Sequence, residues 1–157
     1  MHNQLEIEKL EDLLQSQRFA VIATQGEREP YTNLVAFIHS KDLKQIIFAT
    51  SKNTKKYDNI VKNSKMSMLI DNRGNKPDDI KKTIAVTAVG TADELKHDYN
   101  FYKNLYFKKH PYLIDFIKLP DTVLIYFTVD KYMMVDNFQN VKVIKIGLLL
   151  KKKELNF

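Results

Sequence analysis

The sequence predicts a mainly β protein with flanking helices, in which six to seven mostly antiparallel strands close into a barrel. Two observations lead to this fold class. Apolar runs at 19–24 and 83–89 contain almost no charged residues, which indicates strands that are buried on both faces. Short polar turns separate most runs, as in antiparallel hairpins. Such a sheet buries both faces when it closes and is covered by helices or by a second subunit.

The chain opens with an amphipathic helix and then changes to strand patterns. Leu10, Leu13 and Leu14, preceded by Ile7, form one apolar stripe among acidic residues. Gly90 interrupts one long apolar run and predicts a bend or a bulge. Strands are expected at 18–24, 30–40, 45–51, 65–71, 83–95, 123–136 and 141–149.

Two more segments are expected to be helical, and 72–82 is expected to be a polar loop. The segment 54–63 starts at Thr54, a plausible N-cap, and the aromatic segment 98–119 must break or kink at Pro111. The aromatic stripes predict core packing and some contact with another subunit. Residues 1–157 are expected to form one domain, with a loosely ordered tail at about 150–157.

Composition excludes several classes of protein. With 44% hydrophobic and 28% charged residues, the chain is typical of soluble globular proteins. It contains no cysteine, which removes disulfides and thiolate chemistry and fits a cytoplasmic protein. No segment has the pattern of a signal peptide or a membrane span. The histidines are not at metal-ligand spacing, so no metal site is expected.

The net charge of +6 raises the question of nucleic acid. Only Arg18, Arg28 and Arg73 are arginines, and the lysines are dispersed along the chain. Because tight phosphate and base recognition favours arginine, this composition argues against nucleic acid. A small basic barrel that binds nucleic acid through aromatic stacking and lysines stays as an alternative.

The most informative segment is the lysine pair Lys55 and Lys56, which would open the helix after Thr54. Cations are unfavourable at the positive end of a helix dipole unless an anion lies among them. Free N–H groups, the two ammonium groups and the hydroxyls of Thr50, Ser51 and Thr54 would make a cradle for a phosphomonoester. The alternative is that both lysines project into water.

The order of elements resembles the flavin-binding split barrel of the pyridoxamine 5'-phosphate oxidase-like family over about residues 13–146. The specific part is the succession of 19–24, 29–40 and 46–73, with the lysine pair after a strand that ends in Ala49 and Thr50. This resemblance implies a split β-barrel that binds FMN. It places the FMN phosphate on Thr50, Lys55 and Lys56, with Ser51 and Thr54 as auxiliary ligands.

The resemblance also places the edge of the flavin ring along the second strand, at Thr32, Asn33, Leu34 and Val35. Asn33 is the lone amide in an apolar strand, and a buried amide needs partners that a ring edge with donors and acceptors can supply. The alternative is an asparagine that bonds to neighbouring backbone at the barrel rim.

In the family that the sequence resembles, the flavin lies at a homodimer interface. The candidates to complete the pocket from the other chain are therefore the loop residues Asn72 and Arg73 and the motif Phe138, Gln139 and Asn140. A structural salt bridge is the alternative role for Arg73.

This chain departs from the family's founding enzyme at the charges that hold the substrate. Asn33 and Ile38 stand where that enzyme has an arginine and a lysine, and no arginine follows Arg73. We therefore expect a flavin-dependent oxidoreductase that acts on an unidentified small molecule, not a genuine pyridoxine phosphate oxidase. The alternative is a binding protein of the same fold that holds flavin, haem or a deazaflavin without turnover.

Overall fold

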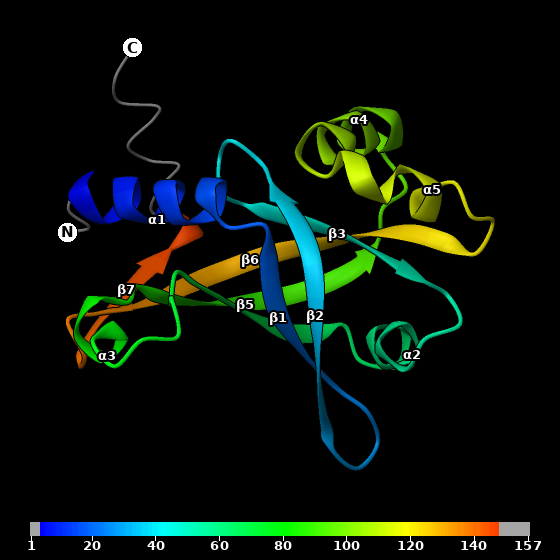
Figure 1. The fold of residues 1–157 in the computed structure, drawn as a ribbon. Coiled ribbons are helices and arrows are strands. Elements are labelled where there is room, and N and C mark those ends of the chain that lie inside the picture. The colour runs from blue at the N-terminus through cyan, green and yellow to red at the C-terminus, as the bar shows by residue number, and fades with distance from the viewer. Residues whose placement is uncertain (1–3, 148–157) are drawn as a thin grey trace.

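The computed structural model describes residues 4–147 and has the predicted mainly β architecture with flanking helices (Figure 1). The strands are β1 Phe19–Gln25, β2 Pro30–His39, β3 Gln45–Ser51, β4 Lys65–Asp71, β5 Ala85–Glu94, β6 Thr122–Asp136 and β7 Asn140–Lys145. The helices are α1 Gln4–Ser16, α2 Lys55–Lys62, α3 Asp79–Lys82, α4 Tyr99–Lys109 and α5 Ile114–Ile117, with a short 3₁₀ turn at Pro111–Leu113. The expected tail at 150–157 lies outside the described residues.

Six of the strands close into an antiparallel barrel, which confirms the predicted fold class. Their order is β3-β2-β1-β4-β5-β6, and β6 returns to pair with β3, for example through Ala49 and Leu124. β7 pairs with β6 outside this ring. β6 is the longest strand, with 15 residues. Its first part pairs with β3, its last part with β7, and β5 pairs with it between Ile125 and Val135.

Gly90 lies at a register shift in the pairing of β5 with β6, as the sequence predicts. A Cβ atom at this position would lie 1.9 Å from the carbonyl oxygen of Thr128. Because this neighbour is backbone and cannot move aside, only glycine allows β5 to approach β6 so closely.

The core has two parts. The larger part fills the barrel, and α1 contributes its predicted stripe of Leu10, Leu13 and Leu14 to it. The smaller part lies between the barrel wall and α4 and α5, and includes Ile47 and Tyr106. Figure 1 shows α1 and α4 on the same side of the barrel.

The burial on both faces that was predicted for β1 and β5 is only partial, and it is β3 that is buried on both faces. All residues from Ile46 to Thr50 are buried, whereas β1 and β5 alternate between buried and half-buried positions. The half-buried set includes Val21, Leu69 and Val89, which lie on one face because β1, β4 and β5 pair in register. The polar residues Ser67 and Thr87 share this half-buried face with them.

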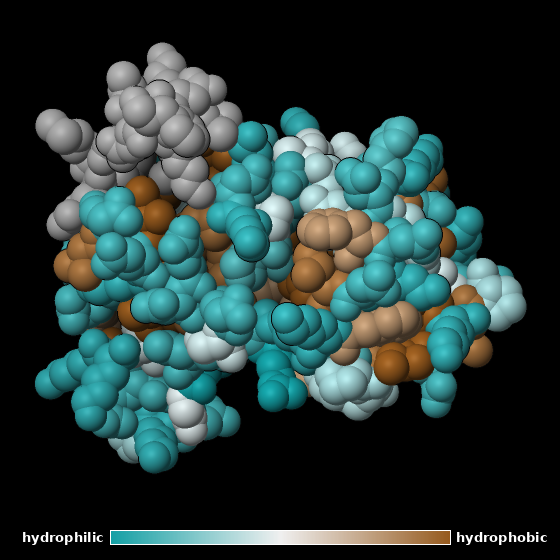
Figure 2. All heavy atoms as spheres, turned by 90° about the horizontal axis from the view of Figure 1, so that it is seen from above, coloured by the Kyte–Doolittle hydropathy of each residue, from teal (hydrophilic) through white to brown (hydrophobic). Residues whose placement is uncertain are grey.

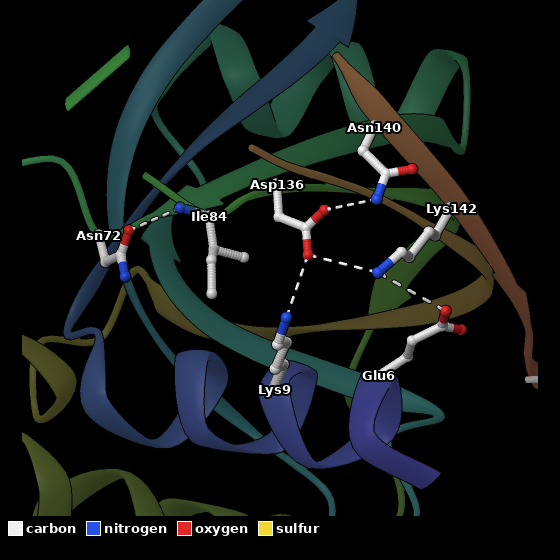
Figure 3. A network of polar contacts seen from close by, with 7 residues as sticks. All are labelled: Glu6, Lys9, Asn72, Ile84, Asp136, Asn140 and Lys142. Carbon is white, nitrogen blue, oxygen red and sulfur yellow. Dashed lines mark hydrogen bonds and ion pairs between the residues drawn. The ribbon is translucent and has the colours of Figure 1, made fainter. Parts of the chain in front are cut away.

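The remaining differences from the expected elements are local. The expected loop at 72–82 contains the short helix α3, where Asp79 accepts a hydrogen bond from the N–H of Lys76 at 3.0 Å. Asn72 closes this excursion because its Oδ1 accepts the N–H of Ile84 at 2.8 Å (Figure 3). The predicted break at Pro111 is confirmed, and β7 ends at Lys145, before the expected boundary.

A polar network joins α1 to the ends of β6 and β7 (Figure 3). The buried Asp136 carboxylate accepts hydrogen bonds from Lys9 at 3.2 Å, Asn140 at 3.1 Å and Lys142 at 3.4 Å. Burial opposes ionisation of this carboxyl, but the two lysines outweigh burial and hold the pKa of Asp136 below its ordinary value. The network thus fixes α1 across the barrel.

Within residues 4–147, no helix is both long and apolar enough to cross a membrane.

Candidate functional site at the start of α2

Thr54 caps α2, as predicted. Its backbone is extended, and its Oγ1 accepts the N–H of Tyr57 at 3.3 Å. Lys55 and Lys56 therefore occupy the first turn, where the helix dipole is positive. Their own N–H groups have no hydrogen-bond acceptor in the part of the chain that the structure describes.

The three hydroxyl groups of the predicted cradle bond mainly within the turn. Thr50 Oγ1 lies 3.1 Å from Thr54 Oγ1, and Thr54 Oγ1 donates to the carbonyl of Ser51 at 2.9 Å. Ser51 Oγ accepts the N–H of Asn53 at 3.2 Å. Thr50 is only 1% exposed, so its hydroxyl supports the turn from below, whereas Ser51 and Thr54 are half-buried.

The two lysines have different surroundings. Lys55 Nζ lies 2.8 Å from Glu29 Oε1 and 4.9 Å from the centre of the Tyr31 ring, and the Glu29 carboxylate raises the pKa of Lys55. Lys56 is half-buried, and burial lowers its pKa. No ion pair of Lys56 is present within residues 4–147, so its charge is not neutralised there.

The side-chain oxygen of Asn33 is buried. Its Oδ1 has no hydrogen-bond partner among the described residues, which argues against the alternative of an amide that bonds to the barrel rim. An unsatisfied buried acceptor costs about 1–3 kcal/mol, so this atom would gain from an external N–H donor. Tyr31, which contacts Lys55, lies two residues before Asn33 on the same face of β2.

The other β2 candidates divide between the two faces of the strand. Val35 is buried on the side of Asn33, whereas Thr32 and Leu34 are exposed on the opposite side, Leu34 by 66%. A ligand that lies along the Asn33 face of β2 would therefore contact the side chains of Asn33 and Val35 but only the backbone of Thr32 and Leu34.

Arg73, Phe138 and Gln139 do not meet the lysine pair within one chain. Arg73 lies two residues after Asp71, which pairs with Ala85. Ala85 in turn pairs with Val135, so this part of the chain lies beside the end of β6. The turn before α2 follows β3, which pairs with the start of β6. The Arg73 guanidinium bonds to Asp71 at 3.0 Å, which is the structural salt bridge of the alternative interpretation.

A cavity of about 550 Å³ beside α2 was not apparent from the sequence. The Tyr57 hydroxyl donates to Glu94 at 2.9 Å at its edge, and Lys52 lies 3.6 Å from the same carboxylate. The hydrogen bond to Glu94 raises the pKa of Tyr57, which therefore stays protonated. Glu94 lies 37 residues after Tyr57 in the chain, so the sequence around α2 does not reveal this pair.

A family model described as pyridoxamine 5'-phosphate oxidase matches residues 7–136. Among curated proteins, none matches the sequence.

Solved structures show the same fold at low sequence identity. A haem-binding protein from Mycobacterium smegmatis has a TM-score of 0.81 at 14% identity, with 96% of this chain and 62% of that chain covered. A Clostridium acetobutylicum protein related to general stress protein 26 has a TM-score of 0.73 at 20% identity, with 94% and 99% covered. An FAD-binding protein from Mesorhizobium loti has a TM-score of 0.65 at 17% identity, with 83% and 90% covered.

The family match extends from α1 to the end of β6 and so includes the lysine pair, Asn33 and all six strands of the closed barrel. With this extent of match and this barrel, the chain belongs to the pyridoxamine 5'-phosphate oxidase family.

Proposed function

We propose that this protein binds FMN, with the phosphate at the start of α2 and the edge of the ring along β2. The observation that carries the proposal is that two groups at one end of β2 have no partner in the described structure. Lys56 is a half-buried cation without a counter-charge in residues 4–147, and Asn33 Oδ1 is a buried acceptor without a donor. A phosphate would supply the negative charge for Lys56, and a ring N–H would donate a hydrogen bond to Asn33.

The residues of the site have distinct roles in this proposal. The N–H groups and ammonium groups of Lys55 and Lys56 hold the phosphate, while Thr50, Ser51 and Thr54 shape the turn that presents them. Asn33 accepts a hydrogen bond from the ring. When bound, the flavin itself supplies hydride and electron transfer, so the protein needs to provide only placement and electrostatics.

The proposed activity is oxidation or reduction of a small molecule other than pyridoxine phosphate. Ile38, which stands in place of a substrate-binding lysine, is 4% exposed and packs in the smaller core. No arginine follows Arg73 to clamp a substrate phosphate.

A homodimer is part of the proposal. The half-buried face of β1, β4 and β5, which carries Val21, Leu69 and Val89 beside Ser67 and Thr87, is the kind of mixed surface that a second copy covers. In such a dimer, Arg73, Phe138 and Gln139 would reach the flavin of the partner. Phe138 is 54% exposed and therefore available for this contact.

An absorbance spectrum of the purified protein is the first test, and we expect the two bands of an oxidised flavin. Mass spectrometry of the released cofactor then distinguishes FMN from FAD, which one structural neighbour binds. A Soret band would instead favour haem. A colourless protein that excess FMN does not reconstitute would contradict the proposal.

Substitution of the lysine pair tests the phosphate site. Lys55→Ala/Lys56→Ala should weaken FMN much more than riboflavin, which lacks the phosphate. Lys81→Ala/Lys82→Ala in α3 removes the same charge from exposed positions and should change neither affinity. Equal losses of FMN and riboflavin would mean that the pair does not contact the phosphate. Oxidation of NADH or NADPH by the loaded protein separates an enzyme from a flavin carrier.

A further inference from the structure

A second cavity, of about 340 Å³, lies between the end of α1, the end of β2 and α4. Figure 2 views the molecule from this side. The cavity is lined by Gln15, Ile38, His39, Leu105, Lys108 and Lys109. His39 is six residues beyond Asn33, which corresponds to about 20 Å along β2. The cavity is therefore separate from the proposed flavin site.

Two lysines and a histidine converge on this cavity, and no carboxylate lines it. Lys108 and Lys109 come from the last turn of α4, and His39 comes from the end of β2. Within residues 4–147, none of these three side chains forms an ion pair. Glu11 acts on His39 only as a more distant charge, whereas Arg18 adds positive charge near Lys109.

Lys109 is the centre of this cluster. Its Nζ donates to the carbonyl of Leu14 at 3.0 Å and lies 4.3 Å from the centre of the Phe37 ring, so the ammonium group is held in place. Burial, with a smaller contribution from Arg18, lowers the pKa of Lys109 to about 8. A desolvated cation beside like charges is stabilised by an anion that it can contact.

His39 can adapt to such an anion. Its Nδ1 lies 3.0 Å from the carbonyl of Ser40, which orients the ring. Burial lowers the pKa of His39, so the ring is neutral near pH 7, and an adjacent negative charge would favour its protonated form. Ile38 and Leu105 add apolar walls beside these polar groups.

We propose that this cavity binds a small organic anion, whose negative group lies among Lys109, Lys108 and His39 and whose apolar part packs against Ile38 and Leu105. Lysines bind as point charges and do not require the planar geometry of a carboxylate, so phosphate monoesters and carboxylates share the required chemistry. The volume is near the lower end of the range for ligand pockets, which limits the body of the ligand to about one ring.

Calorimetric titration of the full chain with four probes tests this site. Phenyl phosphate and benzoate carry an anion on a ring, benzyl alcohol is neutral, and inorganic phosphate lacks the ring. The titrations use the Lys55→Met/Lys56→Met background, so that phosphate at α2 does not contribute. We expect the two ring anions to bind more tightly than benzyl alcohol and inorganic phosphate, and their ratio identifies the preferred anionic group.

Two single variants provide the matched comparison. Lys109→Met keeps the apolar stem over Phe37 and should weaken the ring anions roughly tenfold, the effect of one lost charge-assisted contact. Lys103→Met removes the same charge from the same helix, but Lys103 contacts the rings of Tyr99 and Phe107 and does not line the cavity. It should leave binding unchanged. If Lys109→Met does not fold, the exposed Lys108→Met takes its place, with a smaller expected loss.

Three results would overturn the proposal: no binding of any ring anion, equal binding of benzyl alcohol, or equal losses in Lys109→Met and Lys103→Met. The last would mean that net charge alone attracts the probes. Flavin binding by Lys109→Met in the otherwise native chain should be unchanged, so a failure here is distinguishable from a failure of the flavin proposal.

Discussion

The carboxylate of Glu29 lies 2.8 Å from the ammonium group of Lys55, at the place where the proposed phosphate would bind. Glu29 belongs to the hairpin turn before β2, and both side chains are exposed. Glu29 would therefore compete with the proposed phosphate for Lys55, and it would repel that phosphate as well.

Removal of this competitor should strengthen FMN binding. We expect Glu29→Gln to raise FMN affinity by roughly two- to fivefold, a small effect because exposed ion pairs are weak and are screened by salt. Glu27→Gln is the matched control, because Glu27 pairs with Lys62 at the other end of α2, at 3.5 Å. Quenching of flavin fluorescence measures both affinities. An equal gain for riboflavin would show that Glu29 does not act on the phosphate.

The unsatisfied oxygen of Asn33 predicts opposite effects on stability and on binding. Asn33→Ala removes a buried acceptor that has no donor in the described structure, so the flavin-free protein should unfold at an equal or higher temperature. FMN and riboflavin should both bind roughly tenfold more weakly, because the lost hydrogen bond is to the ring. Thermal melts and fluorescence titrations measure the two effects. A destabilised flavin-free protein would mean that Asn33 has a structural partner.

The lowered pKa of Lys109 predicts a pH dependence of stability. The pKa is about 8 in the folded protein and 10.5 in the unfolded chain, so between these values the unfolded chain binds more protons. The contribution of Lys109 to the free energy of unfolding should therefore rise from pH 8 to pH 10.5. Urea unfolding of the native chain and of Lys109→Met measures this effect: the free energy of unfolding of the native chain minus that of the variant should increase over this pH range. A constant difference would mean that the charge of Lys109 is not buried.

The Asp136 network should contribute measurably to the stability of the fold. Asp136→Asn leaves Lys9 and Lys142 without their carboxylate, and we expect a loss of about 1–3 kcal/mol, less than for a fully buried pair because both lysines are partly exposed. Because the pKa of Asp136 is lowered in the folded state, this contribution is present above pH 3.8 and is lost as the pH falls through the folded pKa.

The exposed ion pair of Asp78 with Lys82 provides the comparison, and Asp78→Asn should change the free energy of unfolding by less than about 0.5 kcal/mol. Chemical unfolding at neutral and acidic pH measures both variants. Similar losses of unfolding free energy in the two variants would show that the burial of Asp136 does not strengthen its ion pairs.

The proposed dimer predicts complementation between two defective chains. Co-expression of Lys55→Ala/Lys56→Ala with Arg73→Ala gives mixed dimers in which one of the two sites has native residues from both chains. If assembly is random, about a quarter of all sites should then bind FMN normally. The FMN content of the purified mixture, compared with each variant alone, measures this. No gain over the separate variants would place Arg73 outside the partner's site.

The parts of the site that depend on neighbouring residues could be predicted from the sequence. Thr54 caps the helix that follows it, and the lysine pair occupies the first turn, because capping is decided within four residues. The sequence could not predict that Arg73 and the lysine pair lie at opposite ends of β6. This depends on the register between β4, β5 and β6, which are far apart in the chain. The pairs Glu29 with Lys55 and Tyr57 with Glu94 escaped sequence analysis for the same reason.

The fold shows the same division. Apolar runs predicted all seven strands, and Gly90 predicted the bulge. The half-buried outer face of β1 and β5 was not predicted, because an apolar run shows that a surface avoids water but not what covers it.

The place of β6 in the barrel has a consequence during protein synthesis. β6 pairs with both β3 and β5, so the ring closes only after residues 122–136 have left the ribosome. Until then, β3 and β5 each have an open edge that can pair with another chain. Closure between strands this distant in sequence is slow, so the nascent chain is most exposed to aggregation and to chaperones just before its last strands emerge.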